Sequence, residues 1–182
     1  MKYRFLKKIL WFTGLSGSGK TTLSNKIISY LEKKKFKCLN LDGDQFRLKK
    51  KYKNSFSKFN IKKNNYLIIK EVKKLRNNYD FIIVSVISPL RVTRDKARKT
   101  FGKDYVEIFV YCSLKELINR DTKGLYKSAK DNKIKNLIGY NSNIKYEKTR
   151  SKKIVVNTKL QNIKQSKKKI IQDLNKKYNV KI

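Results

Sequence analysis

Two kinds of hydrophobic pattern alternate along the chain. Short runs rich in β-branched and aromatic residues, such as residues 81–87, predict strands, because these side chains suit a pleated, covered surface. Apolar residues at helical spacing, as within residues 20–34, predict helices with one buried face. This alternation predicts an α/β fold around a central, mostly parallel sheet. The expected strands are residues 9–13, 38–41, 81–87, 106–111 and 154–156, and the expected helices are residues 20–34, 62–77, 92–100, 114–120 and a C-terminal helix through residues 163–174.

The lengths of the chain and of its apolar runs indicate the class of protein. At 182 residues the chain fits one domain, and we expect residues 1–182 to form it. The longest mostly apolar run, residues 81–87, is much shorter than the ~20 residues that cross a bilayer. The basic and then apolar start has no signal-peptide cleavage site. We therefore expect a soluble cytoplasmic protein without a membrane partner.

Charge and composition exclude several functions. The 48 Lys and Arg against 13 Asp and Glu give a formal net charge of +35. The lysines occur along the whole chain, as at residues 33–35 and 167–169, and no RNA-recognition signature, zinc finger or basic zipper accompanies them. This spread favours solvated helix faces over a specific nucleic-acid site, although a basic field attracts anionic metabolites. The lack of His and the distant Cys38 and Cys112 exclude a zinc site and a disulfide framework.

Residues 14–21, GLSGSGKT, fit the phosphate-binding pattern G-x-x-x-x-G-K-[ST] in full. They lie between a predicted strand and a predicted helix, where backbone N–H groups and the helix dipole favour a phosphate. We expect Lys20 to meet the β- and γ-phosphates of ATP and the Thr21 hydroxyl to ligate Mg²⁺. The short chain has no N-K-x-D base-reading motif, which favours a small-molecule kinase. The expected ATP-binding residues of the loop are Gly14, Leu15, Ser16, Gly17, Ser18, Gly19, Lys20 and Thr21.

Charged residues follow the second predicted strand, at the edge where parallel sheets bind ligands. Asp42 and Asp44 are both candidates to accept a proton from an attacking hydroxyl or to hold Mg²⁺ through water. Arg47 is a candidate to bind an anionic acceptor. The alternative is an Asp-Gly turn that caps the next segment, and the choice between the two carboxylates as catalytic base stays open.

Two later segments carry further candidates. Ser88 follows the buried strand 81–87, so its hydroxyl is a candidate to reach a phosphoryl group or the acceptor, and a capping role is equally open. Arg94 and Arg98 follow at a helical spacing typical of a solvated face. Arg120 and Lys123 end a predicted helix before a glycine, which favours a mobile lid that closes over the γ-phosphate. A plain basic loop is the alternative there.

Taken together, these segments resemble the adenylylsulfate kinases. The resemblance rests on WFTGLSGSGKTT, LDGDQFR, SFS, EVKKL, IIVSVISPLR with RDKAR, VEIFVYCSLKE, RDTKGLYKSA and IKNLIGYNS, in this order along most of the chain. It implies a three-layer P-loop kinase fold, often dimeric. It also implies a reaction in sulfate assimilation, in which ATP phosphorylates the ribose 3′-hydroxyl of adenosine 5′-phosphosulfate (adenylylsulfate) and gives 3′-phosphoadenylylsulfate.

The resemblance also implies roles for single residues. Phe56 is expected to stack on the adenine of the acceptor, and Arg120 joins the ATP-binding residues. The serine at position 88 matches one commonly described as a phosphoserine, whereas direct in-line transfer needs it only to position the acceptor. Lys123 and Leu137 match the lid. The implied acceptor-binding residues are Asp44, Arg47, Phe56, Asn65, Ile87, Ser88, Lys123 and Leu137, and the implied catalytic residues are Lys20, Asp42, Asp44 and Ser88.

The chain departs from this family after residue 57. Family members carry an Asp-Arg pair, an Asn and two further arginines that grip the acceptor, and residues 57–70 contain no arginine. With one inserted residue, Lys62 and Asn65 take the Arg and Asn positions; without it, Ile61 and Asn64 do. Lys does not reproduce the planar fork of Arg. Two other functions stay open: a kinase of another nucleotide 3′-hydroxyl, such as that of cytidine diphosphoramidate in surface-polysaccharide modification, and a basic nucleotide-dependent nucleic-acid-binding protein.

Overall fold

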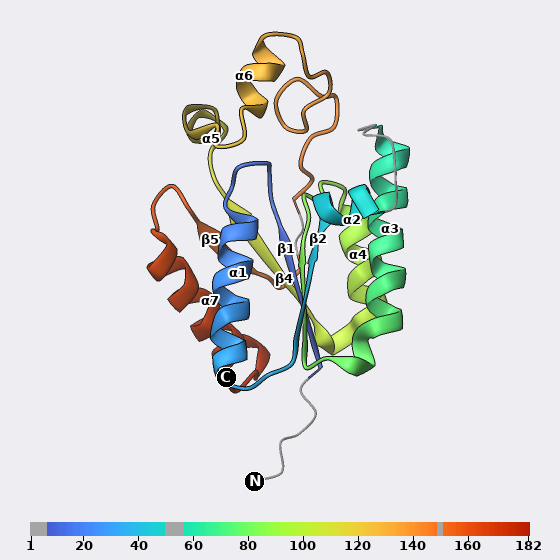
Figure 1. Cartoon of the computed structure of the whole chain (residues 1–182), viewed down its shortest axis with the longest axis vertical. Helices are drawn as coiled ribbons and strands as arrows, with labels where there is room; N and C mark the ends of the chain where they lie inside the picture. Colours follow the sequence, from blue (N-terminus) through green and yellow to red (C-terminus); the bar gives the residue numbers. More distant parts are fainter. Residues whose placement is uncertain (1–6, 50–56, 149–150) are drawn as a thin grey trace.

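The computed structural model describes residues 7–49, 57–148 and 151–182 of the chain (Figure 1). The strands of this part of the chain form one five-stranded sheet in the order β2-β3-β1-β4-β5, and every neighbouring pair is parallel. The predicted α/β class with a parallel sheet is therefore confirmed. The strands are β1 (Lys8–Thr13), β2 (Cys38–Asp42), β3 (Phe81–Ser85), β4 (Tyr105–Tyr111) and β5 (Ile154–Asn157).

Helices cover both faces of this sheet and make three layers (Figure 1). The helices are α1 (Lys20–Lys33), α2 (Gly43–Lys49), α3 (Lys58–Leu75), α4 (Arg91–Phe101), α5 (Leu114–Arg120), α6 (Leu125–Lys130) and α7 (Ile163–Tyr178), with 3₁₀ turns at Arg76–Asn78 and Gly102–Asp104. Along β1, Leu10 and Phe12 share a buried cluster with α1 and α7, whereas Ile9 and Trp11 share one with α3 and α4. Each face of the sheet thus has its own hydrophobic core. None of the described helices is both long and apolar enough to cross a bilayer.

The predicted elements are present, and they differ from the structure mainly at their ends. α3 begins at Lys58 instead of residue 62, because the Ser57 hydroxyl accepts a hydrogen bond from Asn60 N at 3.2 Å and caps the helix. β3 ends at Ser85 instead of residue 87, and three residues later Ser88 has a φ of +43°. The chain therefore leaves the sheet in a turn that hydrophobic pattern alone does not specify.

Two short helices, α2 and α6, were not predicted, and a carboxylate holds the start of each. Asp42 accepts hydrogen bonds from the backbone N–H groups of Asp44 and Gln45, at 2.9 and 3.4 Å. Asp121 does the same for the N–H groups at the start of α6. At 7 and 6 residues these helices are too short for a periodic pattern to reveal them.

The prediction of a solvated face at Arg94 and Arg98 was wrong for Arg94. Its side chain is fully buried, and its Nε lies 3.5 Å from the carboxylate of Glu107 on β4. Arg98 is partly exposed and binds the other oxygen of Glu107 at 2.7 Å. A buried carboxylate needs cationic partners, and α4 supplies two of them at helical spacing.

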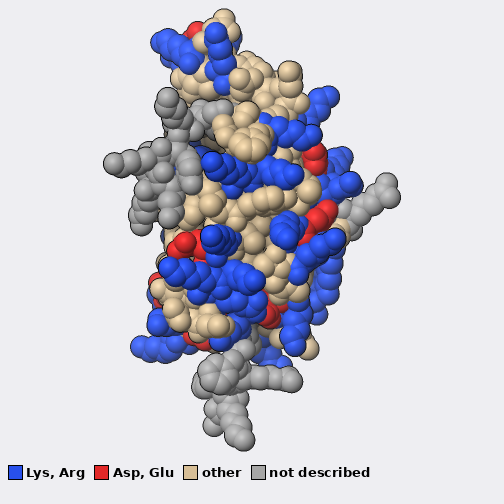
Figure 2. Space-filling model, turned by 90° about the vertical axis from the view of Figure 1, so that its right-hand side faces the viewer, with Lys and Arg blue, Asp and Glu red and all other residues tan. Residues whose placement is uncertain are grey.

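The many lysines are distributed over the surface. Figure 2 shows Lys and Arg in several places on the side of the molecule that carries α3, interleaved with uncharged side chains and a few acidic ones. This view agrees with the expectation of solvated helix faces.

We predict that Gly14→Ala destabilises the fold. Gly14 has a φ of +146°, and a Cβ there would lie 2.3 Å from the carbonyl oxygen of Val110 on β4. We expect the free energy of unfolding, measured by urea denaturation, to fall by about 3 kcal/mol or more, because the clash adds to a backbone strain of about 1–3 kcal/mol. Gly124→Ala is the control, because Gly124 is in the left-handed conformation, with a φ of +64°, and a Cβ there would meet nothing within 4 Å. It should lose less, about 1 kcal/mol. Equal losses would contradict the close approach at Gly14.

Candidate active site

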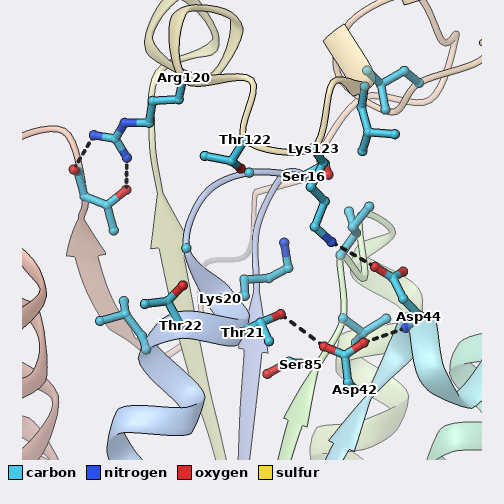
Figure 3. Close-up of a pocket in the computed structure, with 18 of the residues that line it drawn as sticks. Ser16, Lys20, Thr21, Thr22, Asp42, Asp44, Ser85, Arg120, Thr122 and Lys123 are labelled. Atoms are coloured by element: carbon cyan, nitrogen blue, oxygen red, sulfur yellow. Dashed lines mark hydrogen bonds and ion pairs between the residues drawn. The ribbon is translucent and has the colours of Figure 1, made fainter. Parts of the chain in front are cut away.

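The carboxyl ends of the strands open into a cleft of about 1130 Å³, which we call the main cleft (Figure 3). The phosphate-binding loop follows β1 and forms its floor, and the segment around α5 and α6 lies above it (Figure 1). The main cleft brings together residues predicted from five separate segments of the chain. Of the candidate residues, it is lined by Ser16, Gly17, Gly19, Lys20, Thr21, Asp42, Asp44, Arg47, Ile87, Arg120, Lys123 and Leu137.

The loop has the geometry of an anion site. Gly19, in the left-handed conformation, is the N-cap of α1, and no side chain caps this helix. The first N–H groups of α1 are therefore available to a phosphate. Lys20 folds back over the loop, and its ammonium donates to the carbonyl oxygen of Leu15 at 2.7 Å. The hydroxyl of Ser18 is buried without a hydrogen-bond partner among the described residues.

Lys20 has an unusual protonation equilibrium. Its burial lowers the pKa of the ammonium to about 8, and the nearby charge of Lys123 adds to this effect. The carboxylates of Asp44 and Asp42 act in the opposite direction and offset part of it. A bound phosphate would supply further negative charge beside Lys20, so nucleotide binding should favour the protonated form.

Oxygen atoms meet beside the loop in an arrangement that suits Mg²⁺. The Thr21 hydroxyl donates to Asp42 at 3.0 Å. Ser85 pairs with Asp42 in the parallel register of β2 and β3, and its hydroxyl is buried without a partner among the described residues. The described residues contain no cluster of three or more His, Cys, Asp or Glu side chains that could hold a metal alone. Magnesium sites in kinases use one or two carboxylates together with substrate phosphates, so these residues fit that ion.

Asp44 lies between two cations at the mouth of the main cleft. It forms an ion pair with Arg47 on its own helix and another with Lys123, at 3.2 Å, across the cleft (Figure 3). Burial would raise the pKa of the Asp44 carboxyl, but the charges of Arg47, Lys123 and Lys20 hold it below its usual value. The predicted acceptor residues Asp44, Arg47 and Lys123 thus form one charged group.

Arg120 lies on the other side of the main cleft. Its guanidinium donates to the carbonyl oxygen of Thr158 at 2.7 Å and to Glu116 at 2.8 Å, and it points away from Lys20 and Asp44 (Figure 3). Sequence reasoning missed Thr158 and its neighbours, which line this side. Parallel sheets bind ligands at the carboxyl ends of their strands, and this rule, which identified Asp42 after β2, also applies to the residues that follow β5. The missed lining residues include Ser85, Thr158, Gln161 and Asn162.

A second, small pocket of about 30 Å³ adjoins the main cleft. Arg47 and Ile87 line both spaces, so the two share a wall. We call the second space the Ser88 pocket, because Ser88 lies in it, fully buried. The Ser88 hydroxyl accepts from the indole of Trp11 at 3.1 Å and donates to Asn65. The lining residues are Arg47, Asn60, Ile61, Asn64, Asn65, Val86, Ile87, Ser88, Pro89 and Ile138.

The candidates for the Arg and Asn positions of the family lie on different faces of α3. Ile61, Asn64 and Asn65 line the Ser88 pocket, because the helical period of α3 brings them to its inner face. Lys62 is exposed, and its ammonium lies 5.7 Å from the centre of the Tyr66 ring. Lys62 therefore lines neither the main cleft nor the Ser88 pocket. The predicted acceptor residue Phe56 lies outside the described residues.

The fold and the loop together define a protein of the P-loop kinase class that binds nucleotide phosphates. Comparison with known proteins gives the same class. Residues 7–157 match the family described as adenylylsulphate kinase. A probable adenylyl-sulfate kinase of Archaeoglobus fulgidus is 38% identical over 151 residues, which cover 82% of this chain and 95% of the relative. The chain therefore belongs to the adenylylsulphate kinase family.

Further relatives extend this likeness to sequence and fold. The adenylyl-sulfate kinase of Clostridium kluyveri is 38% identical over 164 residues, which cover 90% of this chain and 81% of the relative. Among solved structures, the Mycobacterium tuberculosis APS kinase CysC in complex with AMPPNP and APS superposes with a TM-score of 0.81 at 28% identity. That match covers 92% of this chain and 97% of the other. The predicted three-layer P-loop kinase fold is confirmed.

We predict that binding of a nucleoside triphosphate takes up a proton at alkaline pH. With its pKa lowered to about 8, Lys20 is charged in the free protein below that value and largely neutral above it. Phosphates raise the pKa again, so uptake should be small near pH 7 and approach one proton near pH 9. Calorimetric titration in buffers of different ionisation enthalpy measures it. Lys20→Arg keeps the charge without titrating and should abolish the uptake. Equal uptake at both pH values would contradict the lowered pKa.

Proposed function

We propose that this kinase transfers the γ-phosphoryl group of ATP to the ribose 3′-hydroxyl of adenosine 5′-phosphosulfate, giving ADP and 3′-phosphoadenylylsulfate. The observation that carries the proposal is that one cleft of about 1130 Å³ is lined both by the phosphate-binding loop and by the charged group of Asp44, Arg47 and Lys123. A donor on the loop and an acceptor held by that group would meet within it, and the Ser88 pocket adjoins it through the shared Arg47 and Ile87. The cytoplasmic location and the homodimer stay predictions from the sequence.

On the donor side, the phosphate-binding loop cradles the ATP phosphates. Backbone N–H groups at the start of α1 point at them, and Lys20 neutralises the charge that develops on the γ-phosphoryl group. Arg120, held by Thr158, lies where the remainder of the nucleotide would extend. The residues proposed to bind ATP are Gly14, Leu15, Ser16, Gly17, Ser18, Gly19, Lys20, Thr21 and Arg120.

Magnesium would be held beside the loop. Thr21 would ligate it through its hydroxyl, and Asp42 would hold it through water, as their 3.0 Å contact allows. When bound, Mg²⁺ neutralises charge on the β- and γ-phosphates. Asp42 also accepts a hydrogen bond from the N–H of Asp44, so the same carboxylate fixes the start of α2 relative to the phosphate-binding loop.

On the acceptor side, Asp44 is the better candidate to orient and deprotonate the 3′-hydroxyl. Its carboxylate is exposed at the mouth of the main cleft, whereas Asp42 is engaged with Thr21 and α2. In the free protein Arg47 and Lys123 neutralise Asp44. When the anionic groups of the acceptor draw these cations away, Asp44 becomes free to accept a hydrogen bond and then the proton. The residues proposed to hold the acceptor are Asp44, Arg47, Phe56, Asn65, Ile87, Ser88, Lys123 and Leu137.

Ser88 acts in this proposal by position. Its hydroxyl is fully buried and already engaged with Trp11 and Asn65, which favours a fixed acceptor contact over a phosphorylated intermediate. Direct in-line transfer also needs no covalent intermediate. Ser88→Ala should therefore retain turnover with a raised KM for the acceptor.

An acceptor comparison tests the proposed function. The purified protein with Mg-ATP is offered adenylylsulfate and, separately, cytidine diphosphoramidate, and the products are weighed by mass spectrometry. We expect kcat/KM to be much higher with adenylylsulfate. The reverse preference would leave the ATP site as assigned and show that the altered α3, which gives no arginine to the Ser88 pocket, selects another nucleotide.

Single variants test the roles of Lys20 and Asp44. Lys20→Ala should lower kcat by at least about 100-fold, because it removes the cation that stabilises charge in the transition state. Asp44→Asn should lower kcat by about 100-fold or more, since it removes the proton acceptor while keeping the shape. Lys62→Ala is the matched control, because Lys62 lines neither space. Full activity in Lys20→Ala would contradict the assignment of the ATP site.

A further inference from the structure

The turn that carries Ser88 adopts a backbone conformation that needs support. Ser88 has a φ of +43°, in the left-handed region that disfavours residues with a Cβ. We call residues 87–89 the Ser88 turn. Two carbonyl oxygens of this turn accept hydrogen bonds from side chains: Ile87 O from the Thr13 hydroxyl at 2.6 Å, and Ser88 O from Arg94 at 2.5 Å. The direction of the Ser88 hydroxyl therefore depends on Thr13 and Arg94.

Tyr146 lies behind both of these side chains. Its hydroxyl is 2.8 Å from the Thr13 hydroxyl, and its ring lies 4.8 Å from the Arg94 guanidinium. Thr13 has one hydroxyl proton, which goes to Ile87 O, so Tyr146 must be the donor to Thr13. The result is a chain of hydrogen bonds from Tyr146 through Thr13 to Ile87, whose members strengthen one another in a buried site. Burial raises the pKa of Tyr146 to about 12, so this donor keeps its proton at neutral pH.

The next residue, Glu147, attaches the same segment to the other side of the turn. Its backbone N–H donates to Pro89 O at 2.9 Å, and its carboxylate accepts from Arg91 N at 2.6 Å. Arg94, which holds Ser88 O, also donates to the carbonyl oxygen of Glu147. Residues 146–147 are therefore joined to the Ser88 turn on both sides of Ser88.

This segment is where the chain returns from the predicted lid. The lid begins near Lys123, which pairs with Asp44, and later gives Leu137 to the main cleft and Ile138 to the Ser88 pocket. Near its start, Gly124 has a φ of +64°, and a Cβ there would meet nothing within 4 Å. The lid segment thus begins beside a glycine in the left-handed conformation, and at its second end it is bonded to the Ser88 turn.

We propose that Tyr146 is a positioning residue for the acceptor: it holds the Ser88 turn through Thr13 and joins to it the segment that returns from the lid. This inference rests on the proposed function only in its kinetic readout. Loss of the Tyr146 hydroxyl removes the donor to Thr13 and so weakens the hydrogen bond from the Thr13 hydroxyl to Ile87 O. The Ser88 hydroxyl then loses its fixed direction. Of the phosphate-binding loop, Gly14 N–H donates to Ile87 O at 3.4 Å, whereas Lys20 and the start of α1, where the phosphates would bind, have their contacts elsewhere.

The kinetic test compares Tyr146→Phe with Tyr105→Phe. The Tyr105 hydroxyl is buried in the neighbouring core without a hydrogen-bond partner among the described residues, so its removal is the matched control. In Tyr146→Phe we expect KM for adenylylsulfate to rise about threefold to tenfold, as for the loss of one hydrogen bond, while KM for ATP stays within about twofold. In Tyr105→Phe both values should stay unchanged. A parallel rise of both KM values, or the same change in Tyr105→Phe, would overturn the inference.

A double variant tests the route through Thr13. Thr13→Val removes the hydroxyl that links Tyr146 to Ile87. If Tyr146 acts through it, Tyr146→Phe should add nothing to KM for adenylylsulfate in the Thr13→Val background. If the double variant instead shows the product of the two separate increases in KM, Tyr146 acts independently of Thr13, by general packing, and the inference fails.

A measurement without substrate separates this inference from the proposed function. Hydrogen–deuterium exchange of a peptide that spans residues 86–91 should be faster in Tyr146→Phe than in the wild type, and unchanged in Tyr105→Phe. If the wild type does not phosphorylate adenylylsulfate, the proposed function fails while this result still stands. Unchanged exchange in Tyr146→Phe would overturn the inference whatever the acceptor.

Discussion

The parallel register of the central strands is the constraint on which the site depends. Phe12 of β1 pairs with Ser85 of β3, and Ser85 pairs in turn with Asp42 of β2. Because parallel strands end at one edge, the phosphate-binding loop after β1 emerges beside Asp42 and the buried hydroxyl of Ser85. A shift of β2 by one residue would turn Asp42 to the opposite face of the sheet and separate it from Thr21.

Within that frame, scarce carboxylates organise a strongly basic chain. Asp42 links the loop to α2, and Asp44 draws Arg47 and Lys123 together across the main cleft. In the core, Glu107 collects the side chains of Arg94 and Arg98. Asp44 and Glu107 thus fix cations that would otherwise repel one another, whereas most lysines remain at the surface, where water screens them.

The donor and acceptor sides of the site are supported differently. The phosphate-binding loop is held by elements other than α3: Gly14 fits against Val110 of β4, Tyr126 of α6 donates to Ser16 O, and Thr158 donates to Ser18 O. The acceptor side is fixed by long-range contacts, in which Trp11 and Asn65 orient Ser88, and Tyr146 supports the turn from a distant part of the chain. Donor chemistry can therefore stay the same while changes in α3 alter the acceptor pocket.

The sequence alone determined the strands and long helices, the phosphate-binding loop and the family, because these depend on short-range periodicity and on a contiguous motif. It also placed Asp42 and Asp44 at the ligand-binding edge. Only the tertiary structure decided that Lys62 faces solvent while Asn65 reaches Ser88, that Arg94 is buried against Glu107, and that Tyr146 supports Thr13. These contacts join residues far apart in the chain, so the packing of whole elements, which no local pattern records, specifies them.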